Sequence, residues 1–478
     1  MATRRALGQA GFYALSIVAT RAIGLFMVPY MTRRLTTAEY GSMELMATIA
    51  DVATTVLSFG QIDALFRYAG AAADDAARRR VSAESFGLIV ILAALAAITM
   101  QLLAVPIQYL LADKVPPLGL RFMLVTVALE GAIEVPLAWL RFCERSSLYL
   151  VIILGRTLLQ AALVFVLLEQ GQGVPGVMLA SLIAAAVTAT ILAVTQWRDT
   201  GIRFSRASAT ALLSYGGPLV LAGLGGFVLG TFDRLLLAPA VSLTALAIYA
   251  LAYKVAVLTP QLFQPFAMWW LPRRIQVLLE PGGVERSTRA VSFGLAFLYW
   301  LGFGVATGGV PLIKLMTPPD YHGAIAFLPW LVVATLVQHT ADLVNVGSYA
   351  GHSTRNPMWI NLGAAGVALI GYFLLIPPYG VAGAIAATIL GWAARLVAIF
   401  IDSQRKVPLS LPWLRLGLYA GLLTLAAALT PRDLDLGSAI AACLVGAAVA
   451  AVLGNLLGLA PIPAGLLRRW RSGAVVPP

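Results

Sequence analysis

Residues 85–111, SFGLIVILAALAAITMQLLAVPIQYLL, form an apolar stretch that contains no acidic or basic side chain. The hydrocarbon core of a bilayer is about 30 Å thick, and a helix needs about 20 apolar residues to cross it. This stretch is long enough to cross the membrane once. It therefore predicts a transmembrane helix, and the same pattern can be sought along the rest of the chain.

Comparable stretches recur from Gly8–Tyr30 to Gly437–Leu459. The chain has 478 residues, of which 60% are hydrophobic and 11% charged, with a mean hydropathy of +0.87. Soluble domains contain about 25% charged residues. We expect an all-α polytopic membrane protein with about fourteen transmembrane helices.

The net charge of +12 reflects where the basic residues lie along the chain. If the N-terminus is cytoplasmic, 20 of the 33 Lys and Arg residues fall on the cytoplasmic side, among them Arg78, Arg79, Arg145 and Arg198. The opposite face holds Arg33, Arg34, Lys114, Lys314 and Arg432. This bias follows the positive-inside rule, so we predict that both termini are cytoplasmic and that nucleic acid is not a partner.

Two short motifs recur at nearly the same offset. Gly173-Val174-Pro175-Gly176 matches Gly380-Val381-Ala382-Gly383, and Leu35-Thr36 with Tyr40 matches Leu243-Thr244 with Tyr249. Such a repeat indicates two parallel halves of six helices, a layout found in transporters. We predict a first lobe at 1–207, a second at 208–407, and a C-terminal segment at 408–478 with two helices and a basic tail.

Several ionisable residues lie deep in the predicted helices, where a charge costs about 2.5–3.5 kcal/mol. Arg21, Asp51, Glu130, Glu134, Lys254 and Arg395 fall near mid-membrane, and Asp342 lies somewhat nearer the cytoplasm. Each needs a partner, a hydrated cavity or a function. We treat all of them as candidate site residues.

Glu130, Glu134 and Arg141 share one face of the fourth predicted helix. Their spacing of i, i+4 and i+11 places them within about 60° of one another. They could line a cavity in which the two carboxylates carry a coupling ion, a proton or sodium. Interhelical salt bridges explain the stripe equally well.

Arg21 and Lys254 belong to different halves of the repeat and could together hold an anion such as a phosphate. The alternative is that each pairs with a carboxylate such as Asp51 for insertion alone. Asp63 and Arg67, at i and i+4, are expected to pair with each other. Glycines after Pro218, and Pro260, Pro265 and Pro272, are expected to bend the seventh and eighth helices.

Other chemistry finds little support in the sequence. Cys143 and Cys443 are the only cysteines, His339 with Asp342 and Asn345 is more typical of a satisfied core histidine than of a proton relay, and no nucleotide-binding loop, serine-nucleophile motif or metal-ligand spacing occurs. We expect no cofactor and no enzymatic activity.

The N-terminal segment with Arg21, Pro29, Arg34-Leu35 and Ala38-Glu39-Tyr40-Gly41 resembles the start of the bacterial polysaccharide transport family. Three further matches are Tyr215-Gly216-Gly217-Pro218, Asp233-Arg234-Leu235-Leu236-Leu237 and Ile248-Tyr249-Ala250-Leu251-Ala252-Tyr253-Lys254. This family contains the Wzx-type flippases for lipid-linked oligosaccharides. Its superfamily also contains multidrug and toxin extrusion antiporters and lipid II flippases.

The resemblance implies a V-shaped pair of six-helix lobes that carries undecaprenyl-diphosphate-linked oligosaccharide from the cytoplasmic to the periplasmic leaflet of the inner membrane by alternating access. A polymerase and glycosyltransferases are the partners it implies. Arg21, Arg234 and Lys254 match cationic positions that line or gate the cavity, and Asp233 accompanies Arg234. Ala250 stands where the family often has Ser, and Glu130 and Glu134 match no family motif.

Two other functions remain open from the sequence. A multidrug antiporter of the same superfamily would favour an acidic cavity over a cationic one. A membrane glycosyltransferase or polymerase would need a catalytic outer loop, whereas the predicted outer connections, such as Lys114–Pro117, are short.

Overall fold

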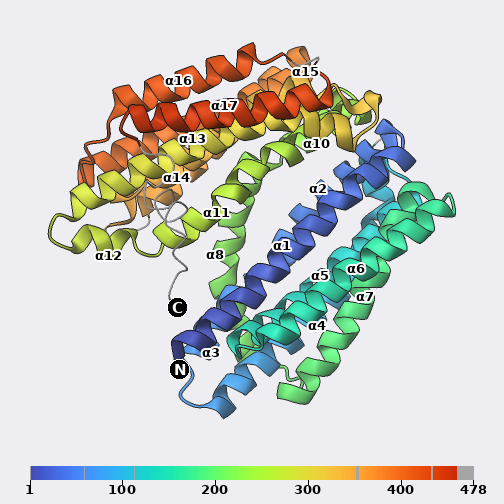
Figure 1. The fold of residues 1–478 in the computed structure, drawn as a ribbon. Helices are drawn as coiled ribbons and strands as arrows, with labels where there is room; N and C mark the ends of the chain where they lie inside the picture. The colour runs from blue at the N-terminus through green and yellow to red at the C-terminus, as the bar shows by residue number, and fades with distance from the viewer. Residues whose placement is uncertain (1, 59, 112–113, 351–354, 432–433, 460–478) are drawn as a thin grey trace. The chain divides into compact units, whose positions relative to one another are not determined.

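The computed structural model describes residues 2–58, 60–111, 114–350, 355–431 and 434–459, and Figure 1 shows their arrangement. Within these ranges the regular secondary structure is α-helical apart from two short 3-10 helices, Pro319–Tyr321 and Gly347–Tyr349, and contains no strand. The chain is an all-α polytopic membrane protein, as predicted. Arg432 and the predicted basic tail after residue 459 lie outside the described residues.

The first seven helices are mostly long and apolar. They are α1 (Ala2–Arg34), α2 (Thr37–Leu57), α3 (Gln61–Gly70), α4 (Asp75–Leu110), α5 (Pro117–Phe142), α6 (Ser146–Glu169) and α7 (Gly173–Thr200). α2 begins with a capping box, in which Thr36 and Glu39 each accept a hydrogen bond from the other's backbone N–H. The span predicted over Ser42–Phe66 is divided between α2 and α3 near Gly60, whose φ is 61°.

Five shorter or broken helices follow. They are α8 (Arg206–Gly230), α9 (Asp233–Ala240), α10 (Leu243–Ala256), α11 (Leu258–Trp270) and α12 (Arg274–Leu279). α10 ends at Ala256 because Pro260 has no N–H to donate to the Ala256 carbonyl. The predicted bend of the eighth span is confirmed. The seventh span is interrupted after Gly230, at Thr231-Phe232, whereas α8 runs through Pro218.

The C-terminal helices are α13 (Gly283–Met316), α14 (Ala324–Val344), α15 (Arg355–Lys406), α16 (Trp413–Leu429) and α17 (Leu436–Leu456). α15 merges two helices across a kink at Gly380, which has φ 55° and ψ −128°. Tyr419 in α16 donates to the Ala450 carbonyl of α17 at 3.0 Å, and α13 contacts both of these helices. The last two helices therefore pack on α13 (Figure 1).

Twelve helices of the described part of the chain are long and apolar enough to cross a membrane. One of these is α15, whose two halves coincide with the spans predicted at Met358–Ile376 and Val381–Ile401. α16 is a further apolar helix of 17 residues. When the two halves of α15 are counted separately and α16 is added, the twelve spans become the predicted fourteen.

The chain forms two compact units. One comprises Met1–Phe227 and Arg234–Ala247, and the other Val228–Asp233 and Ile248–Pro478. In the first unit α5 is central and contacts α2, α3, α4, α6 and α7. The lobes predicted at 1–207 and 208–407 and the segment at 408–478 stay a prediction, because compactness does not test where an ancestral repeat begins.

The first glycine of each repeated motif has a positive φ of nearly the same value. Gly173 has φ 56° and Gly380 has φ 55°, a region that favours glycine. A Cβ on Gly176 would lie 2.8 Å from the Gln172 Cβ, and one on Gly383 would lie 1.9 Å from the Leu375 carbonyl oxygen. Each motif therefore has a positive φ at its first glycine and a close approach at its last.

Candidate functional site

A polar cavity of about 540 Å³ lies inside the first unit, between α2, α5, α6 and α7. Its polar lining consists of Asp51, Thr54, Thr55, Thr126, Glu130, Arg156, Gln160 and Ser181. All four helices are candidate membrane spans. A polar cavity at this place is where an intramembrane transport or coupling site is expected.

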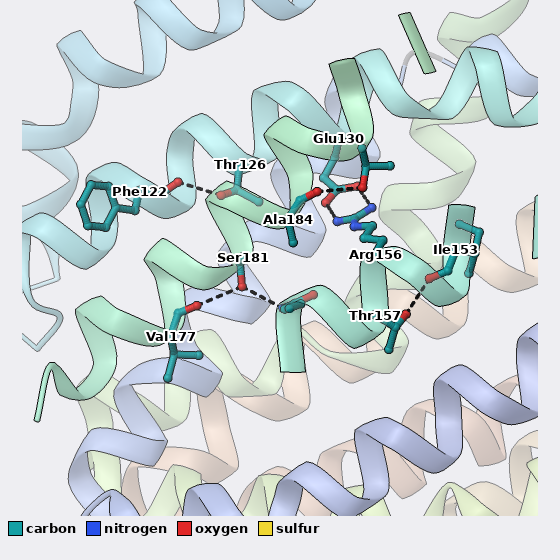
Figure 2. Close-up of polar contacts among 11 residues, drawn as sticks. Phe122, Thr126, Glu130, Ile153, Arg156, Thr157, Val177, Ser181 and Ala184 are labelled. Atoms are coloured by element: carbon teal, nitrogen blue, oxygen red, sulfur yellow. Dashed lines mark hydrogen bonds and ion pairs between the residues drawn. The ribbon is translucent and has the colours of Figure 1, made fainter. Parts of the chain in front are cut away.

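Glu130 on α5 and Arg156 on α6 form the ion pair of this cavity (Figure 2). The guanidinium donates from both terminal nitrogens to the two carboxylate oxygens, and the Nη1–Oε2 distance is 3.0 Å. The side chains are 20% and 24% exposed. This bidentate geometry neutralises Glu130 and fixes both side chains.

Neutral hydrogen bonds hold the other side of the cavity in place. Gln160 on α6 donates to the Ser181 hydroxyl on α7 at 2.9 Å, and Ser181 donates to the Val177 carbonyl at 3.1 Å. Thr126 donates to the Phe122 carbonyl of its own helix at 2.9 Å (Figure 2). The hydroxyls are therefore occupied as donors, and the charged groups dominate the electrostatics of the cavity.

Asp51 contributes a second carboxylate from α2. Its side chain is exposed, and the charges of Arg234 and Glu44 act on it. Arg234 is thus the cation associated with Asp51, whereas the sequence had suggested Arg21 or Lys254 for this role. The cavity lining contains two acids, Asp51 and Glu130, and one base, Arg156.

The predicted stripe of Glu130, Glu134 and Arg141 has three separate environments. Glu130 pairs with Arg156, and the Arg141 guanidinium lies 5.6 Å from the Phe66 ring centroid. The Glu134 Oε2 atom is buried and has no hydrogen-bond partner among the described residues. Glu130 thus lines a cavity and forms the interhelical salt bridge that was the alternative, and Glu134 has no ion-pair partner among the described residues. A coupling role for the two carboxylates stays a prediction.

The second unit contains a comparable group around Arg395 on α15. Arg395 donates to Asp342 at 2.8 Å, to the Asn361 side chain at 2.7 Å and to the Gln338 carbonyl at 3.5 Å. His339 lies 3.4 Å from the other oxygen of Asp342. Asp342 and Arg395 thus satisfy each other, and His339 belongs to this network as expected of a core histidine.

The Asp233-Arg234 motif begins α9, and both side chains are buried. Asp233 accepts a hydrogen bond from the Tyr249 hydroxyl on α10. Phe232 stacks on Tyr372 with ring centroids 6.4 Å apart. Asp233 therefore fastens α9 to α10, and its predicted contact with substrate stays a prediction.

Arg21 and Lys254 belong to the two different units, Arg21 on α1 and Lys254 in the last turn of α10. Arg21 is exposed and forms no ion pair among the described residues, and Lys254 is half-buried. Their predicted convergence on an anion stays a prediction.

The predicted Asp63–Arg67 pair is wrong. Within the described chain these two exposed residues form no ion pair, and the Arg67 guanidinium lies 5.4 Å from the Tyr215 ring centroid. An exposed i, i+4 pair gains only a few tenths of a kcal/mol, so a neighbouring aromatic face can compete for the arginine.

Seven polar residues of these sites were not predicted: Arg156, Gln160, Asn361, Thr54, Thr55, Thr126 and Ser181. Arg156 is the one charged residue of the apolar stretch at 148–168. The insertion cost that identified Glu130 applies equally to Arg156 and could have found it. Gln160 and Asn361 are neutral, and their sequence positions give no comparable signal.

The two polar sites place charged groups inside membrane-spanning helices. Among the described residues no group of three or more His, Cys, Asp and Glu could hold a metal ion. Such a cavity can bind or release a small cation or a proton.

The sequence profile of the polysaccharide biosynthesis protein family matches residues 7–277. A comparison with curated proteins found no match. The profile covers more than half of the chain and includes α1 to α11, with all the residues of the cavity.

Solved structures with the same fold include a lipid II flippase, MurJ, in an inward closed conformation. It has a TM-score of 0.73 and 11% identity, and the match covers 93% of this chain and 98% of the flippase. Two structures of multidrug resistance MATE transporters, inward-facing and outward-facing, have TM-scores of 0.57 and 0.52 at 18% and 15% identity. The first match covers 80% of this chain and 94% of that transporter, and the second 88% and 97%.

Proposed function

The chain belongs to the polysaccharide biosynthesis protein family, and from that premise we propose that it is a flippase for a lipid-linked oligosaccharide. The proposed substrate is an undecaprenyl-diphosphate-linked unit, moved from the cytoplasmic to the periplasmic leaflet of the bacterial inner membrane for surface polysaccharide synthesis. The family match over α1 to α11 is the observation that carries this proposal. Glycosyltransferases and a polymerase are the proposed partners.

The proposed mechanism is alternating access with a cationic path for the diphosphate. A diphosphate cannot cross hydrocarbon unaided, because an unpaired charge there is too costly. In this proposal Arg21, Arg234 and Lys254 hold the anion, Asp233 positions α9 against α10 through Tyr249, and the prenyl tail stays in lipid.

We propose that the acids of the first unit couple transport to an ion. Glu130 is held by Arg156, so Glu134 and Asp51 are the groups able to change their charge. A buried carboxylate oxygen without a hydrogen-bond donor is costly while charged, and binding a proton or a sodium ion removes that cost. Arg141, Asp342 and Arg395 then serve structural roles.

The test is export in a strain that lacks its own flippase. Wild type is expected to restore the surface glycan, and Arg21→Ala or Lys254→Ala is expected to reduce it at least tenfold while the protein remains in the membrane. Arg33→Ala on the same helix removes an equal charge outside the proposed path and serves as the matched control. If Arg21→Ala and Lys254→Ala export normally, the cationic path is wrong.

A multidrug antiporter is the second candidate. The excess of acids over bases in the cavity of the first unit favours it, because cationic drugs need negative partners. Dye efflux that depends on Asp51, without restoration of the glycan, would support the antiporter over the flippase.

A further inference from the structure

A second polar cavity, of about 450 Å³, lies in the same unit, where α4 and α6 begin and α5 and α7 end. Four arginines line it: Arg78 and Arg79 on α4, Arg145 in the turn before α6, and Arg198 on α7. We call it the arginine cavity. The proposed transport function uses none of these four residues.

Half of these arginines are already neutralised. Arg78 pairs with Asp75 at 2.9 Å, and Arg145 pairs with Asp199 at 2.5 Å. Arg79 and Arg198 are exposed and form no ion pair or hydrogen bond among the described side chains, and the Nε of Arg78 is buried without a partner. The lining also contains the Glu144 carboxylate, so its formal charge is four positive against three negative groups. Two guanidinium groups and one buried N–H without an ion-pair partner among the described residues can therefore still contact an anion.

The walls of the cavity are held in place. Trp139 is 5% exposed and stacks on Phe142 with ring centroids 5.5 Å apart and planes 13° apart. The tight turn after α5 includes Glu144, whose φ is 56°, and a hydrogen bond of 2.9 Å from the Arg145 N–H to the Leu140 carbonyl. This turn fixes Cys143 and Arg145 at the cavity.

The position of the cavity favours a lipid. It lies at the ends of membrane spans, on the side that the charge bias predicts to be cytoplasmic. Trp197, beside Arg198, is 66% exposed, and Phe204 is 57% exposed, as is typical of aromatic residues at the membrane interface. Basic pockets between helices on this side of a membrane bind anionic lipid headgroups.

We propose that the arginine cavity binds the phosphate of an anionic phospholipid headgroup through Arg79 and Arg198. The guanidinium groups supply charge-assisted hydrogen bonds to phosphate oxygens. Because the site joins the ends of α4, α5 and α7, a bound headgroup would hold together the helices that carry Glu130 and pack around its cavity. Free phosphate shares this chemistry and is distinguished by the test.

Cys143 provides the readout, because it lines the arginine cavity and is half-buried. The full chain with Cys443→Ser, purified in neutral detergent, is labelled with a maleimide. Burial raises the pKa of the Cys143 thiol, so labelling is followed at about pH 8.5. Phosphatidylglycerol is expected to slow labelling at least threefold, and phosphatidylcholine or inorganic phosphate at the same concentration is expected to leave the rate unchanged.

Arg79→Gln with Arg198→Gln is expected to abolish the protection. Arg203→Gln with Arg206→Gln removes the same charge from exposed positions outside the cavity and is expected to retain it. The charge of Arg79 also acts on the Cys143 thiol, so its removal can change the labelling rate by itself. For each variant we therefore compare the labelling rate with lipid to the rate of the same variant without lipid. Arg198→Gln alone repeats the test should the double variant be poorly folded.

Two outcomes would overturn the proposal. Protection by phosphatidylglycerol that persists without Arg79 and Arg198 would place the lipid elsewhere. Protection by inorganic phosphate without protection by the lipid would identify a soluble anion as the ligand. Either result leaves the proposed flippase function intact, because labelling does not require transport.

Discussion

At the scale of single residues, each unit contains an arginine within a membrane span that pairs with a carboxylate on a neighbouring helix. Arg156 on α6 meets Glu130 on α5, and Arg395 on α15 meets Asp342 on α14. Burying a charge inside a membrane span requires such a partner. The partner also neutralises the charge, which is why the proposed ion coupling assigns the response to Glu134 and Asp51.

The Glu130–Arg156 pair can be tested by a double-mutant cycle. Arg156→Gln leaves the Glu130 carboxylate without its partner. Removing one partner of a buried ion pair lowers the free energy of unfolding by about 3–5 kcal/mol. Since both side chains are partly exposed, we expect the lower end of that range and a drop of several degrees in Tm in detergent. Glu130→Gln combined with Arg156→Gln should recover most of the loss, because no charge then remains unpaired. Equal Tm values for the wild type, Arg156→Gln and the double variant would show that the pair contributes nothing.

The sequence predicted which residues of these sites are unusual, but not their partners. Insertion cost depends only on depth along one helix, so it identified Glu130, Asp342 and Arg395. Pairing depends on which helices are neighbours and on how each is rotated. Those are long-range properties, and they explain why the pairing of Glu130 with Arg156 was not predicted and why Arg67 lies on Tyr215.

At the scale of helices, hydropathy and proline positions were sufficient for most of the architecture. Apolar length predicted the spans, and Pro260 predicted the break between α10 and α11. The glycines after Pro218 predicted a bend in the seventh span, and its interruption follows directly after Gly230. The interruption near Gly60 was not predicted, because an isolated glycine in an apolar helix does not by itself show whether the helix continues.

The kink of α15 provides a prediction at this scale. A Cβ on Gly383 would lie 1.9 Å from the Leu375 carbonyl oxygen, so Gly383→Ala should force the two halves of the helix apart. We expect a loss of several degrees in Tm and poor recovery of the purified protein. Gly363→Ala, in the same helix and with no atom within 4 Å of its Cβ, should be neutral or stabilising by up to about 1 kcal/mol. A Gly383→Ala protein as stable as Gly363→Ala would show that the close approach is not maintained.

At the scale of the whole molecule, orientation is the property on which the direction of transport depends. The charge bias predicts that the turn between α6 and α7 is periplasmic and that the turn between α12 and α13 is cytoplasmic. Gln170 in the first of these turns and Glu285 in the first turn of α13 are exposed and are suitable positions for single cysteines.

The single cysteines are introduced into a chain without Cys143 and Cys443, and a membrane-impermeant maleimide is applied to cells with a permeabilised outer membrane. The reagent should label Gln170→Cys. It should label Glu285→Cys only after the inner membrane is disrupted. Labelling in the reverse order would place the arginine cavity on the periplasmic side. It would also reverse the proposed direction of transport, because the substrate is assembled in the cytoplasm and must enter from that face. Equal labelling of both positions in intact cells would instead indicate a leaky inner membrane, which a cytoplasmic marker protein detects independently.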